Sequence, residues 1–310
     1  MSNPNDDARK AAAEKMNELY QSVTDRIVAL IEGGTKPWEM PWAPSQGKGL
    51  CLLPANLITA RRYSGINTLI LWIEAIEKGY PTHGWLTFRQ ANEKGAKVRK
   101  GEKATTVVYV NRREVEEDDG KGGKQKKMVG FLKSYSVFNL AQVTGLPDEY
   151  TGTAVPFDED DSLDRVKAII KGSNIPVFWG ADKAFYNRKT DQIAMPSRAS
   201  FRDDDACFAT LFHEMSHATG NDKRLNRTFG KRFGDKEYAA EEVVAELSSA
   251  FLCAALGFQH EHESAAYIGH WVEVMKADNR AIFHAASHAS HAADWLLECE
   301  HADTDKVAAE

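Results

Sequence analysis

The chain has 310 residues, of which 43% are hydrophobic and 27% are charged; these values exclude a fibrous or wholly disordered protein and, at this length, predict two domains. The net charge of −6 is uneven, because residues 1–150 carry 22 Lys and Arg against 18 Asp and Glu, whereas residues 151–310 carry 17 against 27. The first half is therefore suited to a polyanionic partner, which the second half would repel.

The four cysteines (Cys51, Cys207, Cys253 and Cys299) are widely spaced. They form neither a disulfide framework nor a metal-binding pair, so we expect reduced thiols. The polar, charged beginning of the sequence does not resemble a secretory leader, and no apolar run approaches the ~20 residues that are needed to cross a bilayer. We expect a cytoplasmic protein with no membrane partner.

The first predicted element is a helix over residues 9–32, which two glycines end. A loop with two Pro-Trp pairs follows, and Trp38 and Trp42 either fill the core or offer flat faces on which unpaired bases stack. A polar, basic turn over residues 54–67 precedes an apolar helix over residues 68–77. The candidate nucleic-acid contacts in this turn are Asn56, Arg61, Arg62, Tyr63 and Asn67.

Residues 89–103 form a basic segment with six cations against two anions. Two strands are expected after it, over residues 104–111 and 128–138, and the charged, glycine-containing stretch 114–127 between them is expected to be a mobile loop. A strand pair flanked by cations and aromatic residues suits single-stranded nucleic acid, and a solvated basic face is the alternative. This part adds the candidate contacts Trp85, Arg89, Lys97, Arg99, Lys100 and Lys103.

An acidic, breaker-rich stretch over residues 151–162 is the best linker in the chain. It divides a first domain, residues 1–150, from a second, residues 163–310. The second domain is expected to begin with a helix over residues 163–172. Short strands near residues 175–179, 184–187 and 192–195 follow, the last two as a hairpin whose edge is the candidate partner for an extended polypeptide.

The stretch 207–221 contains His-Glu-x-x-His at His213, Glu214 and His217 in a predicted helix. Two histidines four residues apart lie on one helix face, about 6 Å apart along the axis, so they can hold one metal ion. A catalytic zinc site takes three protein ligands and leaves the fourth position to water. Glu214 is placed to take a proton from that water, as in zincins. The alternative is a helix with two satisfied histidines and a surface glutamate.

A later helix, over residues 236–257, places Glu242 and Glu246 four residues apart among small and apolar neighbours. A carboxylate that faces the core is costly unless it is paired or binds a metal. We therefore expect Glu242 to be the third metal ligand and Glu246 to support a ligand histidine. Glu241, one residue further round the helix, is the rival ligand, and a solvated acidic face is the alternative.

The C-terminal part, residues 263–300, is expected to form one or two long helices that cover the site. It carries a possible second metal-binding stripe at helical spacing, which an alanine-rich surface face explains as well. The stripe consists of His284, His288 and His291.

Taken together, the motifs of both halves resemble those of the ArdC-type antirestriction proteins of conjugative plasmids, over about residues 20–297. In the first half the resemblance rests on Pro37-Trp38, Pro41-Trp42, Pro54-x-Asn56, Tyr63-x-Gly65-x-Asn67, Trp85-Leu-Thr-Phe-x-Gln90, Val98-x-Lys100-Gly101-Glu102 and Val137-Phe-Asn139. In the second half it rests on Tyr186, Ile193-x-Met-Pro196, His213-Glu-x-x-His217, Glu241-Glu242-x-x-Ala-Glu246, and Ala266-Tyr267-Ile268 with Trp271.

The resemblance implies an N-terminal domain that binds single-stranded DNA, a C-terminal zincin-like metallopeptidase domain, and the protection of incoming plasmid DNA from host restriction enzymes. We predict an α+β fold of these two domains, with zinc, or alternatively manganese, held by the ligands above and Tyr267 as a candidate for stabilising the oxyanion. The protein substrate is open, with a restriction-system component as the hypothesis. Two rival classes are a cytosolic metalloprotease with a protein-docking first domain and a DNA-binding protein with a non-catalytic zincin fold.

Overall fold

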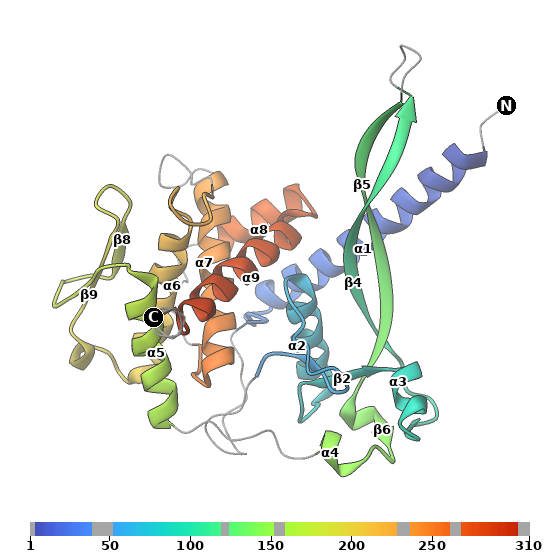
Figure 1. Cartoon of the computed structure of the whole chain (residues 1–310), viewed down its shortest axis with the longest axis horizontal. Coiled ribbons are helices and arrows are strands. Elements are labelled where there is room, and N and C mark those ends of the chain that lie inside the picture. The colour runs from blue at the N-terminus through green and yellow to red at the C-terminus, as the bar shows by residue number, and fades with distance from the viewer. Residues whose placement is uncertain are drawn as a thin grey trace, which may run out of the picture. The chain divides into compact units, whose positions relative to one another are not determined.

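The computed structural model describes residues 4–38, 52–118, 124–151, 159–227, 236–260 and 268–302. Its mixture of helices and sheets confirms the predicted α+β fold (Figure 1). The chain divides into two compact units, and the second takes in two segments from the first half of the sequence. The first unit is Met1–Glu18, Pro54–Arg62 and Ile70–Gly152, and the second is Leu19–Leu53, Tyr63–Leu69 and Thr153–Glu310.

Much of the expected linker lies outside the described residues, and its last residues begin helix α5 (Glu159–Ser173). The predicted helices of the first half are present as α1 (Pro4–Glu32) and α2 (Ile66–Lys78). The apolar side chains of α2 fill the core, with Leu69, Leu71 and Trp72 fully buried. Among the described helices, none combines the length and apolar character that a membrane span requires.

The first unit is built on a four-stranded sheet in the order β1-β2-β5-β4. Its strands are β1 (Ala55–Asn56), β2 (Gly84–Thr87), β4 (Thr105–Asp118) and β5 (Lys124–Asn139). A smaller sheet pairs β3 (Lys97–Val98) with β6 (Val143–Thr144), and short helices α3 (Phe88–Glu93) and α4 (Asp148–Thr151) complete the unit. Helix α3 starts at a capping box, in which the Thr87 and Gln90 side chains each bond the other residue's backbone.

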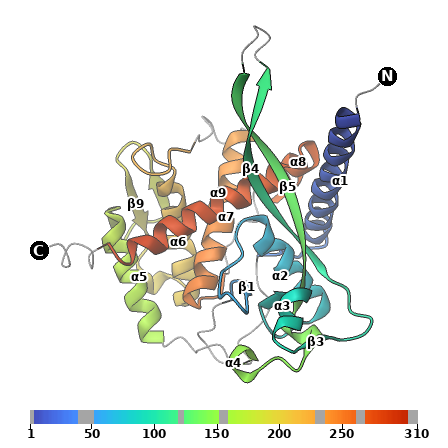
Figure 2. The same cartoon turned by 45° about the vertical axis from the view of Figure 1, so that its right-hand side comes forward.

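The two predicted strands are confirmed as the antiparallel pair β4–β5, which twists along its length (Figure 2). The expected loop over residues 114–127 was wrong, because the pairing continues to Asp118 and resumes at Lys124. In the backbone register Glu116 pairs with Lys126 and Asp118 pairs with Lys124, so both ends of this stretch belong to the strands.

The second unit combines a three-stranded sheet with a group of packed helices. The sheet has the order β7-β9-β8, with β7 (Val177–Trp179) parallel to β9 (Gln192–Met195) and β8 (Phe185–Asn187) antiparallel to it, so the predicted hairpin is confirmed. Ile193 and Met195 face the core and are fully buried. The helices that follow are α6 (Asp204–Thr219), α7 (Lys236–Leu256), α8 (Ile268–Ala277) and α9 (Ala281–Cys299).

Capping residues define both ends of helix α6. The Asp203 side chain caps it by accepting from the Ala206 backbone N–H at 2.8 Å, and Gly220 follows its last turn. Helix α7 packs against both α6 and α9. Because the alanines of α9 face inward, its histidines at positions 284, 288 and 291 are exposed, as expected for the surface-stripe alternative.

Candidate metal centre

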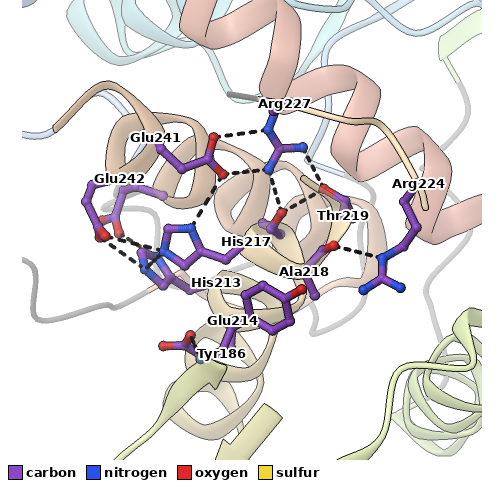
Figure 3. A network of polar contacts seen from close by, with 12 residues as sticks. Tyr186, His213, Glu214, His217, Ala218, Thr219, Arg224, Arg227, Glu241 and Glu242 are labelled. Atoms are coloured by element: carbon purple, nitrogen blue, oxygen red, sulfur yellow. Dashed lines mark hydrogen bonds and ion pairs between the residues drawn. The ribbon is translucent and has the colours of Figure 1, made fainter. Parts of the chain in front are cut away.

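Two histidines and a glutamate from two helices converge on one point (Figure 3). His213 and His217 lie one turn apart on α6, and Glu242 lies on α7. The two Nε2 atoms are 3.1 Å apart. The Glu242 carboxylate oxygens lie 3.4 Å from Nε2 of His213 and 3.5 Å from Nε2 of His217. Ligand atoms of all three residues thus fall within 4.8 Å of one another, and within the described part of the chain this is the cluster suited to a metal ion.

The second ring nitrogen of each histidine faces a buried carboxylate. Glu246 Oε2 lies 3.6 Å from Nδ1 of His213, and Glu241 Oε1 lies 3.5 Å from Nδ1 of His217. When the imidazole is neutral, as a metal ligand must be, a carboxylate at Nδ1 fixes its tautomer and leaves the lone pair of Nε2 directed at the ligand position. The sequence analysis expected Glu242 at that position, with Glu241 as its rival. In the structure Glu242 lies beside both Nε2 atoms, and Glu241 lies behind His217 at Nδ1.

Sequence reasoning missed one residue of this centre, Arg227. Its guanidinium donates to both carboxylate oxygens of Glu241, at 2.6 and 3.1 Å, to Thr219 Oγ1 at 2.7 Å and to the carbonyl of Ser216 at 2.7 Å. The Arg227 and Glu241 side chains are each only 5% exposed. In the sequence, Arg227 is one of several cations between two helices, and no spacing rule distinguishes it from the others.

Glu214 lies beside the histidines and is held by the sheet. Its Oε2 accepts a hydrogen bond of 2.7 Å from the backbone N–H of Tyr186 on β8. The Tyr186 hydroxyl donates to Asp191 at 2.8 Å and accepts from Asn221 at 2.9 Å, while Arg224 pairs with the same Asp191. The hairpin is therefore fixed against the end of α6, so the position of Glu214 depends on both elements.

The charges of the centre are strongly coupled. Burial alone would lower the pKa of His213, but the nearby carboxylates of Glu242 and Glu246 raise it to about 10. The pKa of His217 is likewise raised to about 9, against burial, by Glu241 and Glu242. Burial opposes ionisation of Glu242, yet the two histidines hold its pKa well below the usual range. Glu241 and Glu242, whose pKa values are lowered, thus stay ionised and favour positive charge on the two imidazoles.

The structure separates the aromatic DNA candidates from the basic ones. Trp38 is 1% exposed, with its ring 5.9 Å from that of Trp271, and Trp85 is fully buried. A base cannot stack on a ring that has no exposed face, so these two tryptophans fill the core. Trp42 and the oxyanion candidate Tyr267 lie outside the described residues.

The polar candidates have two kinds of surroundings. Asn56 is engaged within the protein, where it bonds Gln90 and accepts from the backbone of Ile58 and Thr59. Tyr63 and Asn67 are half-buried and belong to the second unit. The candidate cations of the first unit are exposed, and of these Arg89 and Arg99 form ion pairs with nearby glutamates. The exposed set is Arg61, Arg62, Arg89, Lys97, Arg99, Lys100 and Lys103.

The fold and the site together define a two-unit protein with a zincin-like metal centre. Residues 164–288 match the family described as zincin-like metallopeptidase, and residues 17–138 match the N-terminal domain of anti-restriction factor ArdC. In crystal structures, the antirestriction ArdC protein of plasmid R388 is 40% identical in its metal-free form, with a TM-score of 0.75 over 91% of this chain and 97% of that one. Its Mn(II)-bound form is 38% identical, with a TM-score of 0.73 over 91% and 98%. The chain belongs to the family of ArdC-type antirestriction proteins.

Two further relatives place the chain in a wider group. The uncharacterized protein y4eC of Sinorhizobium fredii is 37% identical over 286 residues, which cover 90% of this chain and 91% of that protein. A DNA primase TraC of Escherichia coli is 33% identical over 308 residues, which cover 93% of this chain but 28% of the primase. Most of this chain is thus similar to one part of a longer DNA primase.

Proposed function

We propose that this antirestriction protein hydrolyses peptide bonds at a metal ion held by His213, His217 and Glu242. The observation that carries the proposal is the convergence of two Nε2 atoms and one carboxylate, each histidine being backed by a second carboxylate. Two imidazoles and a glutamate form a known catalytic zinc set. The donors therefore fit the metal that the zincin-like family implies. Zinc is the first candidate, and manganese is the second because a related crystal structure is Mn(II)-bound.

When bound, such an ion polarises the peptide carbonyl and lowers the pKa of a bound water. Residues of the chain supply the proton transfer and hold the reacting groups in position. Glu214 takes the proton of the attacking water on a carboxylate oxygen and delivers it to the leaving amine. The Tyr186 backbone N–H, 2.7 Å from Oε2, orients that carboxylate. Glu246 and Glu241 hold the two imidazoles with Nε2 forward.

The test compares the wild type with Glu214→Gln and, as a matched control on the exposed face of α8, Glu273→Gln. Purified protein is loaded with zinc or manganese and incubated with unstructured polypeptides and, separately, with restriction-enzyme subunits, our hypothesis for the natural substrate. We expect Glu214→Gln to keep the metal but lose hydrolysis, and Glu273→Gln to keep both. A wild type that binds metal stoichiometrically and cleaves nothing would favour a non-catalytic zincin fold.

We propose a second function for the first unit: binding of single-stranded DNA that enters during conjugation, in the cytoplasm. The proposal is supported by the exposed cations between residues 89 and 103 and by the similarity of the chain to an ArdC N-terminal domain and to a DNA primase. A labelled oligonucleotide and its duplex are titrated at two salt concentrations. We expect preferential single-strand binding that weakens as salt rises. If no binding is found at low salt, the alternative is favoured, which is a metalloprotease whose first domain docks a protein.

A further inference from the structure

With Trp85 buried, the described part of the first unit exposes three large aromatic residues, namely Phe88 and two tyrosines on the β4–β5 pair. Tyr109 is 55% exposed and Tyr135 is 48% exposed. An exposed aromatic ring in water gains from being covered, and nucleobases are flat groups that cover it well. These residues were not among the candidates that the sequence indicated.

The strand register places both rings on one face. Tyr109 pairs with Lys133, and Tyr135 pairs with Val107. Residues that pair directly across antiparallel strands share a face, as do residues two apart on one strand, so Tyr109, Lys133 and Tyr135 lie on the same side. The two tyrosines are diagonal neighbours, a separation of about 7–8 Å. An antiparallel sheet with neighbouring exposed aromatics is the arrangement by which RNA-recognition sheets stack two or three bases.

The same face continues into the core, which makes it a rigid support. Thr105, Val107 and Val137 belong to this face at the next positions along the strands, and all three are buried. The two tyrosines are therefore the first exposed residues on this face after its buried part. Aromatic residues with few torsion angles on an anchored strand lose little entropy when a ligand covers them.

The charged residues around the two tyrosines indicate which kind of ligand this face would bind. Lys133 is exposed on the tyrosine face, and three exposed lysines of the same unit form no ion pair with any residue the structure describes; they are Lys97, Lys100 and Lys103. A cationic surface with stacking rings suits a polyanion whose base faces are open, which is single-stranded rather than duplex DNA.

We propose that Tyr109 and Tyr135 form the base-stacking platform of this protein, with Lys133 beside them to contact the phosphates. The proposal rests on the single-stranded DNA binding proposed above. It assigns the platform to the face of the β4–β5 pair that carries the two tyrosines. Phe88, the other exposed aromatic residue in the described part of this unit, is a test of that choice: its ring lies 6.4 Å from Phe138, whose position along β5 directs it to the opposite face.

The experiment uses the full chain and a labelled oligothymidylate. Tyr109→Ala and Tyr135→Ala should each weaken binding, within the roughly 5- to 150-fold range that loss of one stacked base gives, while Tyr→Phe at either position should stay within about twofold of the wild type. Neither alanine variant should change the slope of log affinity against log salt. Lys133→Gln should reduce that slope by about one. Far-ultraviolet dichroism and metal binding check that each variant is folded.

The outcomes separate this inference from the function on which it rests. If the wild type does not bind the oligonucleotide, the proposed function fails. If the wild type binds but Tyr109→Ala and Tyr135→Ala bind equally well, or Phe88→Ala alone weakens binding, the platform assignment is overturned. Photocrosslinking with 5-iododeoxyuridine gives a second reading, in which the modified peptides should contain Tyr109 and Tyr135.

Discussion

Replacing Arg227 with methionine tests whether the buried pair behind His217 organises the metal centre. Methionine keeps most of the apolar length of arginine but removes the guanidinium. Glu241, 5% exposed, is then left ionised in the core without its cation, and Thr219 Oγ1 and the Ser216 carbonyl each lose a donor. Removing one partner of a buried ion pair costs about 3–5 kcal/mol, because the other charge stays buried without compensation.

Urea unfolding of the metal-free protein measures this loss, read from the midpoint of a transition whose slope should not change. Lys276→Met is the matched control, since it breaks an ion pair with Glu32 whose side chains are 56% and 51% exposed. Such an exposed pair is worth at most about 1 kcal/mol. The double variant Arg227→Met with Glu241→Met should be more stable than Arg227→Met alone, because it removes the uncompensated charge as well.

Metal affinity gives an independent reading of the same variant. Without Arg227, the carboxylate of Glu241 is free to turn away from Nδ1 of His217, and loss of a partner behind a ligand histidine weakens metal binding about 10- to 100-fold. A competition titration with a chromophoric chelator measures this change. The reasoning is refuted if Arg227→Met costs no more stability than Lys276→Met and binds zinc as tightly as the wild type.

Three other predictions concern the ligand set, a half-buried histidine and a core tryptophan. Glu242→Ala should abolish stoichiometric zinc binding, whereas Glu241→Gln should only weaken it about 10- to 100-fold, as measured by the same chelator titration. Burial lowers the pKa of His83 to about 4, so the unfolded chain binds more protons below pH 6.5. Stability should therefore fall between pH 6.5 and 4, by at most about 3 kcal/mol because the ring keeps some exposure, and His83→Gln should flatten that part of the urea-derived stability profile. Trp38→Ala should destabilise the protein by about 3–5 kcal/mol, and an unchanged unfolding midpoint would contradict its place in the core.

The α6 histidines and the fold class could be predicted because each follows from a short, regular spacing. Two histidines four residues apart share a helix face in any helix, so the position of Glu214 between them follows as well. The preference for Glu242 over Glu241 does not follow from spacing in the same way. Neighbouring helical residues point about 100° apart, and only the packing of α7 against α6 determines which one reaches Nε2.

The wrong predictions for the first half of the chain have a related cause. The stretch 114–127 has the composition of a loop, yet the backbone pairing of β4 with β5 takes in both of its ends, because composition does not determine how far a strand pair extends. The tryptophans illustrate the same limit for side chains. Their chemistry suits both a core and a stacking surface, and the exposure that separates Trp85 from Tyr109 arises from packing between segments far apart in the chain.

The charge balance of α7 explains why this centre favours a cation. Glu241, Glu242 and Glu246 are all buried on one helix, and a buried carboxylate is costly unless positive charge or hydrogen-bond donors compensate it. Arg227 compensates the first. Glu242 lies against Nε2 of both histidines, whereas Glu246 lies behind the ring of His213 at Nδ1, so it is the charge of Glu242 that is directed at the point where the two Nε2 atoms meet. A divalent ion at that point would replace the imidazole protons and compensate Glu242. The acidic pattern of α7, costly in an ordinary core helix, is therefore consistent with a protein that folds around a metal site.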